Sequence, residues 1–188
     1  MPVISSREGE EKGIMDAARL MLISARTAPK SGGFDDIFTA IVSEVEKERL
    51  ADEMEKIGQE RQIVGFQRDA KNVKDSGLVV LIGVHGNKKM GFSCGACGFV
   101  SCNEFEKVEK KEGKDFLGPT CVFKSLDLGI ALGSASKTAS MLNVDNRMMY
   151  RIGTAARRLN MLPKATVIIG IPLSVKGKNI YFDRRPKL

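Results

Sequence analysis

The order of predicted elements along the 188-residue chain indicates an α/β layered fold with a small cysteine-rich insertion. Two observations support the layers: apolar residues recur at helical spacing in several segments, and two short runs have the composition of buried strands. A third supports the insertion, because all four cysteines lie within one 28-residue window. We therefore expect a single domain over residues 1–188, with residues 92–123 inserted into it.

The first half of the chain is predicted to be mainly helical. Residues 10–26 carry Ile14, Ala17 and Met21 at the spacing of an amphipathic helix, which ends where a proline and two glycines follow. From Asp35 to about Gly58 the apolar spacing predicts one or two surface helices. A short helix is expected over residues 62–73.

The second half is predicted to alternate strands and helices. Residues 78–84 and 165–171 are apolar and rich in β-branched residues, which is typical of strands buried on both faces. Between them, residues 126–142 predict a helix with a face of small residues, so a neighbour must pack close to its backbone. Asp145 is placed to cap a further helix that ends near residues 160–163.

The strongest local signal is the cysteine window. It reads CGACGFVSC and later GPTC, and its cysteines are Cys94, Cys97, Cys102 and Cys121. Two cysteines separated by two residues can place both sulfurs on one metal centre, and Gly95 and Gly98 relieve the backbone where it turns around that centre. Five phenylalanines in the window would exclude water from it. They are Phe92, Phe99, Phe105, Phe116 and Phe123.

Three states of this window are compatible with the residues: a [4Fe–4S] cluster, a structural Zn site, and a set of free thiols. Zinc ribbons normally pair their ligands as two CxxC knuckles, and only one is present, which favours the cluster. His85 is the only histidine, no nucleophile and acid are identifiable around it, and no catalytic residue is predicted.

Composition and charge exclude several classes of protein. The net charge of +7 favours an anionic partner, although the positive charge is unevenly spread, with five basic residues against one acid from Pro172 onward. No apolar run approaches the roughly 20 residues of a membrane helix, and the acidic N-terminus lacks an export signal, so we expect a cytoplasmic protein with no membrane partner. Aromatic residues cluster among the cysteines rather than among basic residues, which argues against a nucleic-acid partner.

Two resemblances attach to these motifs. CGACGFVSCNEF resembles the four-cysteine [4Fe–4S] domain of corrinoid iron–sulfur proteins and of the B subunit of the Rnf electron-transport complex, which implies that all four cysteines are cluster ligands. Across nearly its full length, the chain resembles an uncharacterised prokaryotic family of ferredoxin-domain-containing proteins. The matching stretches include ARTAPKSGG, RDAKNV, DLGIALGSA, VDNRMMYRIGTAA and GIPLSVKGKNIYFDR.

A third resemblance concerns the core. The order of elements is similar to that of a minimal FMN-dependent nitroreductase, in which a turn like ARTAPKSGG follows the first helix beside the flavin. That resemblance implies an intertwined homodimer with FMN at the subunit interface. It also implies two sets of cofactor-binding residues, an early one (Arg26, Thr27, Lys30, Ser31) and a late one in the basic tail (Lys176, Lys178, Arg184).

The sequence therefore predicts a redox flavoprotein: a nitroreductase-like, FMN-dependent oxidoreductase with an iron–sulfur site for electron transfer. Its partners would be a small-molecule electron acceptor or a redox partner protein. Two alternatives remain, namely a non-catalytic ferredoxin-like electron carrier or metal or redox sensor, and a zinc-stapled binding protein.

Overall fold

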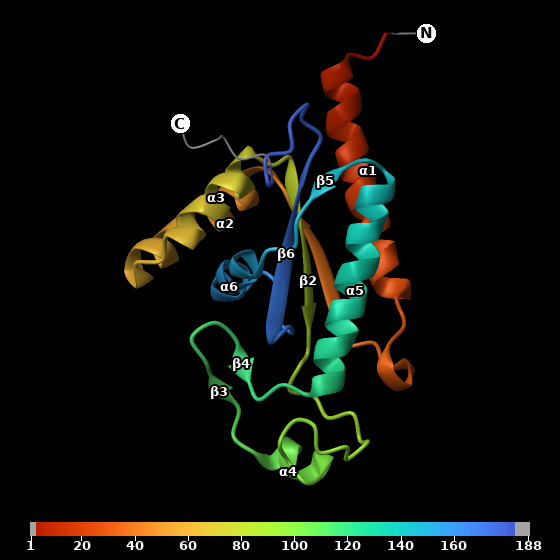
Figure 1. The fold of residues 1–188 in the computed structure, drawn as a ribbon, viewed down its shortest axis with the longest axis vertical. Helices are drawn as coiled ribbons and strands as arrows, with labels where there is room; N and C mark the ends of the chain where they lie inside the picture. Colours follow the sequence, from red (N-terminus) through yellow and green to blue (C-terminus); the bar gives the residue numbers. More distant parts are fainter. Residues whose placement is uncertain (1–2, 183–188) are drawn as a thin grey trace.

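The computed structural model describes residues 3–182 and shows a four-stranded antiparallel sheet with helices on both faces (Figure 1). The strands lie in the order β1-β2-β6-β5. Their bounds are Ile37–Val42 for β1, Leu78–Val84 for β2, Asp145–Asn146 for β5 and Val167–Ser174 for β6. One face is covered by α1 (Ser6–Thr27) and α5 (Val122–Met141), and the other by α2 (Glu44–Arg61), α3 (Val64–Asp75) and α6 (Tyr150–Arg158). The predicted α/β layered fold is confirmed.

Strand β2 lies inside the sheet and is buried along its whole length, as its sequence predicts. Val80 and Ile82 join the core with α1 and α5, whereas Val79 and Leu81 join the core with α2, α3 and α6. Successive side chains of a strand point to opposite faces. A strand without polar residues therefore requires helices on both sides of the sheet.

The predicted helix at the start of residues 35–58 is wrong. Ile37 and Ile41 have helical spacing, but residues 37–42 form β1, which pairs with β2 from Ile37↔Val84 to Val42↔Val79. The run IFTAIV is rich in β-branched and aromatic residues, which favours a strand once a neighbouring strand can pair with it. The helix α2 begins only at Glu44. The cysteine window therefore follows the second strand and not the first.

The predicted capping role of Asp145 is also wrong. Asp145 lies in β5, where it pairs with Ser174 of β6, and helix α6 begins five residues later at Tyr150. An acidic residue ahead of an apolar periodic run is typical of a helix N-cap. Here the segment instead pairs with β6, a long-range contact that the local pattern does not report.

The small-residue helix α5 has two different faces. Ala131, Ala135 and Ala139 are fully buried in the core that α5 shares with α1, so the predicted close neighbour is helix α1 and the sheet. Gly129 and Gly133 lie on the exposed face, where a Cβ would meet no atom within 4 Å. Leu126 and Ile130 are also exposed on α5, at 53% and 45%.

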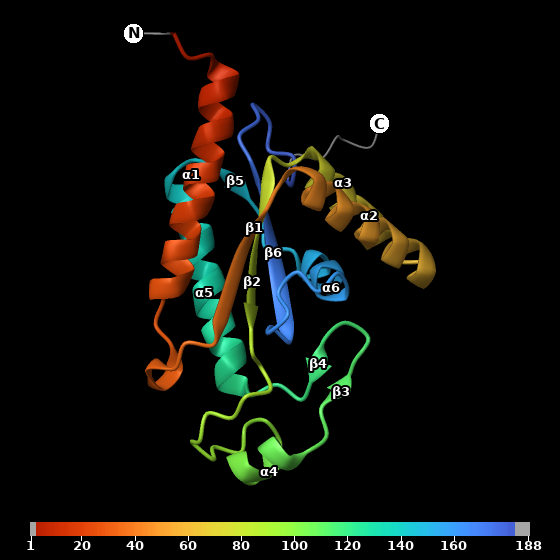
Figure 2. The ribbon, with the colours of Figure 1, turned by 180° about the vertical axis from the view of Figure 1, so that it is seen from behind.

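The cysteine-rich segment lies at one end of the molecule, between β2 and α5 (Figures 1 and 2). It contains the short helix α4 (Cys102–Lys107) and a hairpin of β3 (Lys111–Glu112) and β4 (Leu117–Gly118). The turn after α1, which includes the short helix η1 (Ser31–Gly33), lies at the same end (Figure 2). No helix within residues 3–182 has the length and apolar character required to cross a membrane.

Candidate functional site

The four cysteines line one cavity in this segment. Cys94 and Cys97 come from the loop before α4, Cys102 begins α4, and Cys121 immediately precedes α5. None is in a disulfide, and their exposure falls from Cys94, which is exposed, to Cys121, which is buried. Within residues 3–182, no three Cys, His, Asp or Glu groups are arranged so that they could hold a metal ion. The thiols thus surround a cavity without converging on one point.

Aromatic side chains cover this cavity. Phe105 is buried with Cys121. The ring of Phe99 packs edge-on against the ring of Phe105, with centroids 5.7 Å apart. Phe92 and Phe123 make a second edge-on pair at 5.1 Å. Four of the five phenylalanines therefore form the predicted apolar cover. Phe116 does not, because it packs against Tyr150 of α6 instead.

The backbone around the thiols has the conformation that its glycines allow. Gly95 and Gly98 have φ values of 75° and 88°, as the predicted turn around a centre requires. The Ser93 backbone N–H donates to Cys102 Sγ at 3.2 Å. This bond, and further backbone N–H groups near the sulfur, lower the pKa of the Cys102 thiol against the opposing effect of burial. The thiolate is the form that binds metals, so the loop favours ligation.

The early set of predicted FMN contacts is bonded within the chain itself. Arg26 donates to Asp35 and to the Ile37 carbonyl, and Thr27 donates to the Ile23 carbonyl. Lys30 donates to the carbonyls of Ala25, at 2.8 Å, and Arg26. Burial is also the main reason that the pKa of Lys30 is lowered. Thr27 and Lys30 therefore bond carbonyls in the last turns of α1, and Arg26 holds the segment that leads into β1.

The late set lies elsewhere. Lys176 and Lys178 are exposed after β6, and Lys176 borders a cavity shared with Arg7 and Ile14 in the first half of α1. Between Ile14 and Thr27 the helix rises by roughly 20 Å, so one chain does not bring Lys176 to the Lys30 turn. Arg184 lies outside the described residues.

The turn after α1 meets the cysteine-rich segment at the first turns of α5. Ser31 donates from both its backbone N–H and its hydroxyl to Asp127 Oδ1, each at 2.8 Å. A Cβ at Gly32 would lie 3.3 Å from Phe92 Cζ, and Phe92 packs on Phe123 of α5. We call this group the junction; it consists of Ser31, Gly32, Phe92, Phe123 and Asp127. It places the predicted flavin turn in contact with the aromatic cover of the thiol cavity.

Sequence reasoning missed the charges buried beside the junction. Lys124 is 1% exposed and donates to Asp36 Oδ2 at 2.6 Å, and Lys88 donates to Asp36 Oδ1 at 2.7 Å. Burial alone would raise the pKa of Asp36, but the two lysines lower it. The available signal was the presence of Lys124 and Asp127, three residues apart, in a helix of small apolar residues, because buried charges are rare unless paired.

Asp127 also has an unsatisfied oxygen. The residue is 1% exposed, and its Oδ2 has no hydrogen-bond partner among residues 3–182. An unpaired polar atom in the interior costs about 1–3 kcal/mol, more when it is charged. The junction therefore has a buried acceptor that a hydrogen-bond donor would stabilise.

The fold is similar to that of solved nitroreductases. It is similar to nitroreductase CinD from Lactococcus lactis in complex with nicotinic acid, with a TM-score of 0.57 and 12% identity over 94% of this chain and 81% of that one. A nitroreductase with bound FMN from Desulfitobacterium hafniense gives a TM-score of 0.53 and 10% identity over 94% and 81%. Nitroreductase A from Vibrio parahaemolyticus gives a TM-score of 0.54 and 12% identity. The match covers 87% of this chain but only 59% of that protein. The predicted nitroreductase-like fold is confirmed.

Sequence comparison identifies the family. Residues 117–184 match the family described as uncharacterised proteins containing a ferredoxin domain (DUF2148). An uncharacterised protein of Archaeoglobus fulgidus is 47% identical over 185 residues, which cover 98% of this chain and 99% of the relative. The chain therefore belongs to this ferredoxin-domain-containing family. The family description names a ferredoxin domain, whereas the structural neighbours, at 10–12% identity, establish the fold alone.

Proposed function

We propose that this protein is an FMN-dependent oxidoreductase that receives electrons through a [4Fe–4S] cluster held by Cys94, Cys97, Cys102 and Cys121. In this proposal, residues 92–123 form the iron–sulfur unit inserted into a single nitroreductase-like domain over residues 1–188. The observation that carries the proposal is the junction, where the turn after α1 contacts the aromatic cover of the cysteines. A cluster transfers single electrons and a flavin accepts one or two, so the pair would couple one-electron donors to two-electron reduction.

The four thiols around one cavity support a cluster rather than a single metal ion. Each cysteine of such a cluster binds a different iron atom, so its ligands must surround a volume, as these four thiols do. The Ser93 N–H donates to Cys102 Sγ, and hydrogen bonds to the sulfurs tune the potential of a cluster. The phenylalanines that line the cavity would limit the access of water to the more buried thiols, Cys121 above all, which is a second means of tuning.

The junction fits a flavin ring better than a phosphate. Arg26, Thr27 and Lys30 already donate to the chain, whereas Asp127 Oδ2 needs a donor. An N–H group of the ring would supply one, while a phosphate would be repelled by the carboxylate. In this proposal the exposed Lys176 and Lys178 hold the FMN phosphate.

The proposal requires a homodimer, because Lys176 lies beside the first half of α1, whereas the junction of the same chain lies beyond the other end of that helix. The exposed apolar residues Leu126 and Ile130 of α5, and Ile23 of α1, support an interface on this helical layer. We expect the variant Ile130→Glu to be monomeric by light scattering and to lose FMN. The control Val64→Glu changes a residue that is 75% exposed on α3 and should remain dimeric. A monomeric wild type would contradict the interface.

The first experiment is an absorbance spectrum of anaerobically purified protein, with iron, zinc and released flavin quantified on the same sample. The proposal predicts about four irons and one FMN per chain. Stoichiometric zinc without iron would overturn the cluster and favour a zinc-stapled binding protein. Iron without flavin would favour the second candidate, a non-catalytic electron carrier or redox sensor, which the intrachain bonds of Arg26 and Lys30 also support.

Variants separate the two cofactors. Cys97→Ser and Cys121→Ser should each lose most of the iron, whereas the control Ser134→Ala, further along α5 from Cys121, should retain it. Lys176→Gln combined with Lys178→Gln should weaken FMN binding at least tenfold at unchanged iron content. The control Lys56→Gln removes an exposed charge from α2, on the other face of the sheet, and should not change FMN affinity. Unchanged affinity in the double variant would exclude the phosphate placement.

A further inference from the structure

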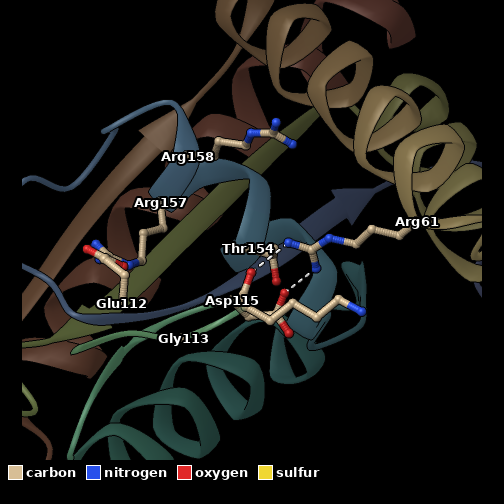
Figure 3. Close-up of a pocket in the computed structure, with 8 residues that line it drawn as sticks. Arg61, Glu112, Gly113, Asp115, Thr154, Arg157 and Arg158 are labelled. Carbon is tan, nitrogen blue, oxygen red and sulfur yellow. Dashed lines mark hydrogen bonds and ion pairs between the residues drawn. The ribbon is translucent and has the colours of Figure 1, made fainter.

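A second pocket lies on the other side of the sheet from the junction. It is enclosed by the end of α2, the β3–β4 hairpin and α6 (Figure 3). Neither the predicted flavin contacts nor the cysteines line it. The side chains used below are Arg61 of α2, Glu112, Lys114 and Asp115 of the hairpin, and Thr154 and Arg157 of α6.

The pocket has an excess of positive charge. Its lining contains three arginines and one lysine against one glutamate and one aspartate, which leaves two net positive charges. The side chains of Arg61 and Arg157 are only 17% and 20% exposed, so they are partly shielded from water. Charges in such surroundings interact more strongly with an anion than those on an open surface do.

The hairpin holds two of these arginines in place. Arg61 pairs with Asp115 and donates to the Lys114 carbonyl at 2.6 Å, while Arg157 pairs with Glu112 (Figure 3). A guanidinium has five N–H donors, and each of these bonds uses one. Both arginines therefore keep donors for another acceptor while their positions are already fixed.

Thr154 provides an observation independent of charge. It is 3% exposed, and its Oγ1 has no hydrogen-bond partner within the described part of the chain. Tyr150, one turn earlier in α6, donates its hydroxyl proton to Asp115, and the nearby Thr154 hydroxyl only partly offsets the rise in the pKa of Tyr150 that burial and Asp115 cause. Figure 3 shows Thr154 projecting from α6 toward Arg61 and Asp115. A buried hydroxyl without a partner is unfavourable, so the pocket has a donor that an acceptor from a ligand would satisfy.

We propose that this pocket binds a phosphate group, with Thr154 Oγ1, Arg61 and Arg157 as donors and Lys114 as a further counter-charge. A phosphate dianion matches the net charge of the lining, and its oxygens suit the planar guanidinium groups. Because β3 and β4 belong to the chain between Cys102 and Cys121, a bound phosphate would also brace the cysteine-rich segment against α2 and α6.

Inorganic phosphate is the first probe, titrated into the purified holoprotein by calorimetry against NaCl of equal ionic strength. We expect saturable binding to the wild type. Thr154→Val should weaken it about tenfold, because the hydrogen bond to a charged group is lost while the shape is kept. Lys114→Gln should weaken it severalfold. No saturable heat in wild type above the NaCl reference would overturn the proposal.

Two controls are matched to these variants. Ser136→Ala removes another unpartnered buried hydroxyl, on α5 across the sheet, and Lys111→Gln removes a lysine from the same hairpin that does not line the pocket. Both should bind phosphate like the wild type. Without phosphate, Thr154→Val should be at least as stable to heat as the wild type, which shows that it folds. Binding that Thr154→Val leaves unchanged would place the phosphate elsewhere and overturn the assignment.

A parallel titration with AMP distinguishes the source of the phosphate. Tighter binding of AMP than of inorganic phosphate, lost in Thr154→Val, would indicate the phosphate of a larger organic ligand. Equal or weaker binding of AMP would indicate free phosphate. Because binding is read by heat rather than by activity, the result is independent of whether FMN or a cluster is present.

Discussion

The buried ion pair beside the junction makes a sharp prediction about stability. Lys124 and Lys88 bond the two oxygens of one carboxylate, that of Asp36, at 2.6 and 2.7 Å. Their surroundings differ greatly, because the Lys124 side chain is 1% exposed and that of Lys88 is 54% exposed. Replacing each by methionine therefore compares a buried with an exposed pair on the same partner.

Lys124→Met should lower the free energy of unfolding by about 2–4 kcal/mol. Breaking a fully buried pair costs about 3–5 kcal/mol, because the partner is left as an uncompensated charge, and the remaining bond from Lys88 reduces this value here. For a chain of this size each kcal/mol lowers Tm by about 2–4 °C, which gives a decrease of roughly 4–16 °C. Lys88→Met should cost less than about 1 kcal/mol, since exposed pairs contribute little.

The assay is thermal unfolding followed by circular dichroism, at one protein concentration and without added phosphate. The double variant Lys124→Met with Asp36→Asn should recover part of the loss, because it also removes the stranded charge. Since Lys124 lies one turn after Cys121, the iron content of Lys124→Met should fall as well. Equal decreases in Tm for Lys124→Met and Lys88→Met would refute the argument that burial sets the strength of this pair.

Three further predictions concern packing and pH. Gly153→Ala should destabilise the protein by about 3 kcal/mol or more, because a Cβ there would lie 1.6 Å from the Ile168 carbonyl oxygen. Gly129→Ala, on an open helix face, should instead stabilise the monomer by about 0.5–1 kcal/mol. Urea unfolding measures both changes, and a stabilising Gly153→Ala would contradict the close approach of α6 to β6. Because Phe105 is 1% exposed, Phe105→Ala should lower the free energy of unfolding by about 3 kcal/mol. It should also release iron faster in air, as timed by loss of visible absorbance, and an unchanged rate would mean that this ring does not shield the thiols. Because the pKa of Asp36 is lowered on folding, its contribution to stability is complete above its unfolded pKa of about 3.9 and is lost as pH falls through the lower folded value. Urea midpoints from pH 6 to pH 2 should therefore fall less steeply in Asp36→Asn than in wild type.

Local pattern alone determined much of the fold. The 3.6-residue spacing of α1 and the apolar run of β2 predict elements that the structure contains, because each pattern depends on residues close together in the chain. The same holds for the cysteine loop, where Gly95 and Gly98 have the backbone conformation that their type allows. The clustering and spacing of the four cysteines also indicated a redox or metal site without reference to the fold.

Contacts between distant residues decided the rest. Residues 37–42 have a spacing that fits a helix, and only pairing with β2 makes them a strand. Lys30 has the charge of a phosphate ligand, but in the folded chain it caps α1. Asp36 and Lys124 are 88 positions apart, and no local pattern predicts their bond. Neither does any sequence spacing report the pocket around Thr154, because its walls come from three separate elements that only packing brings together.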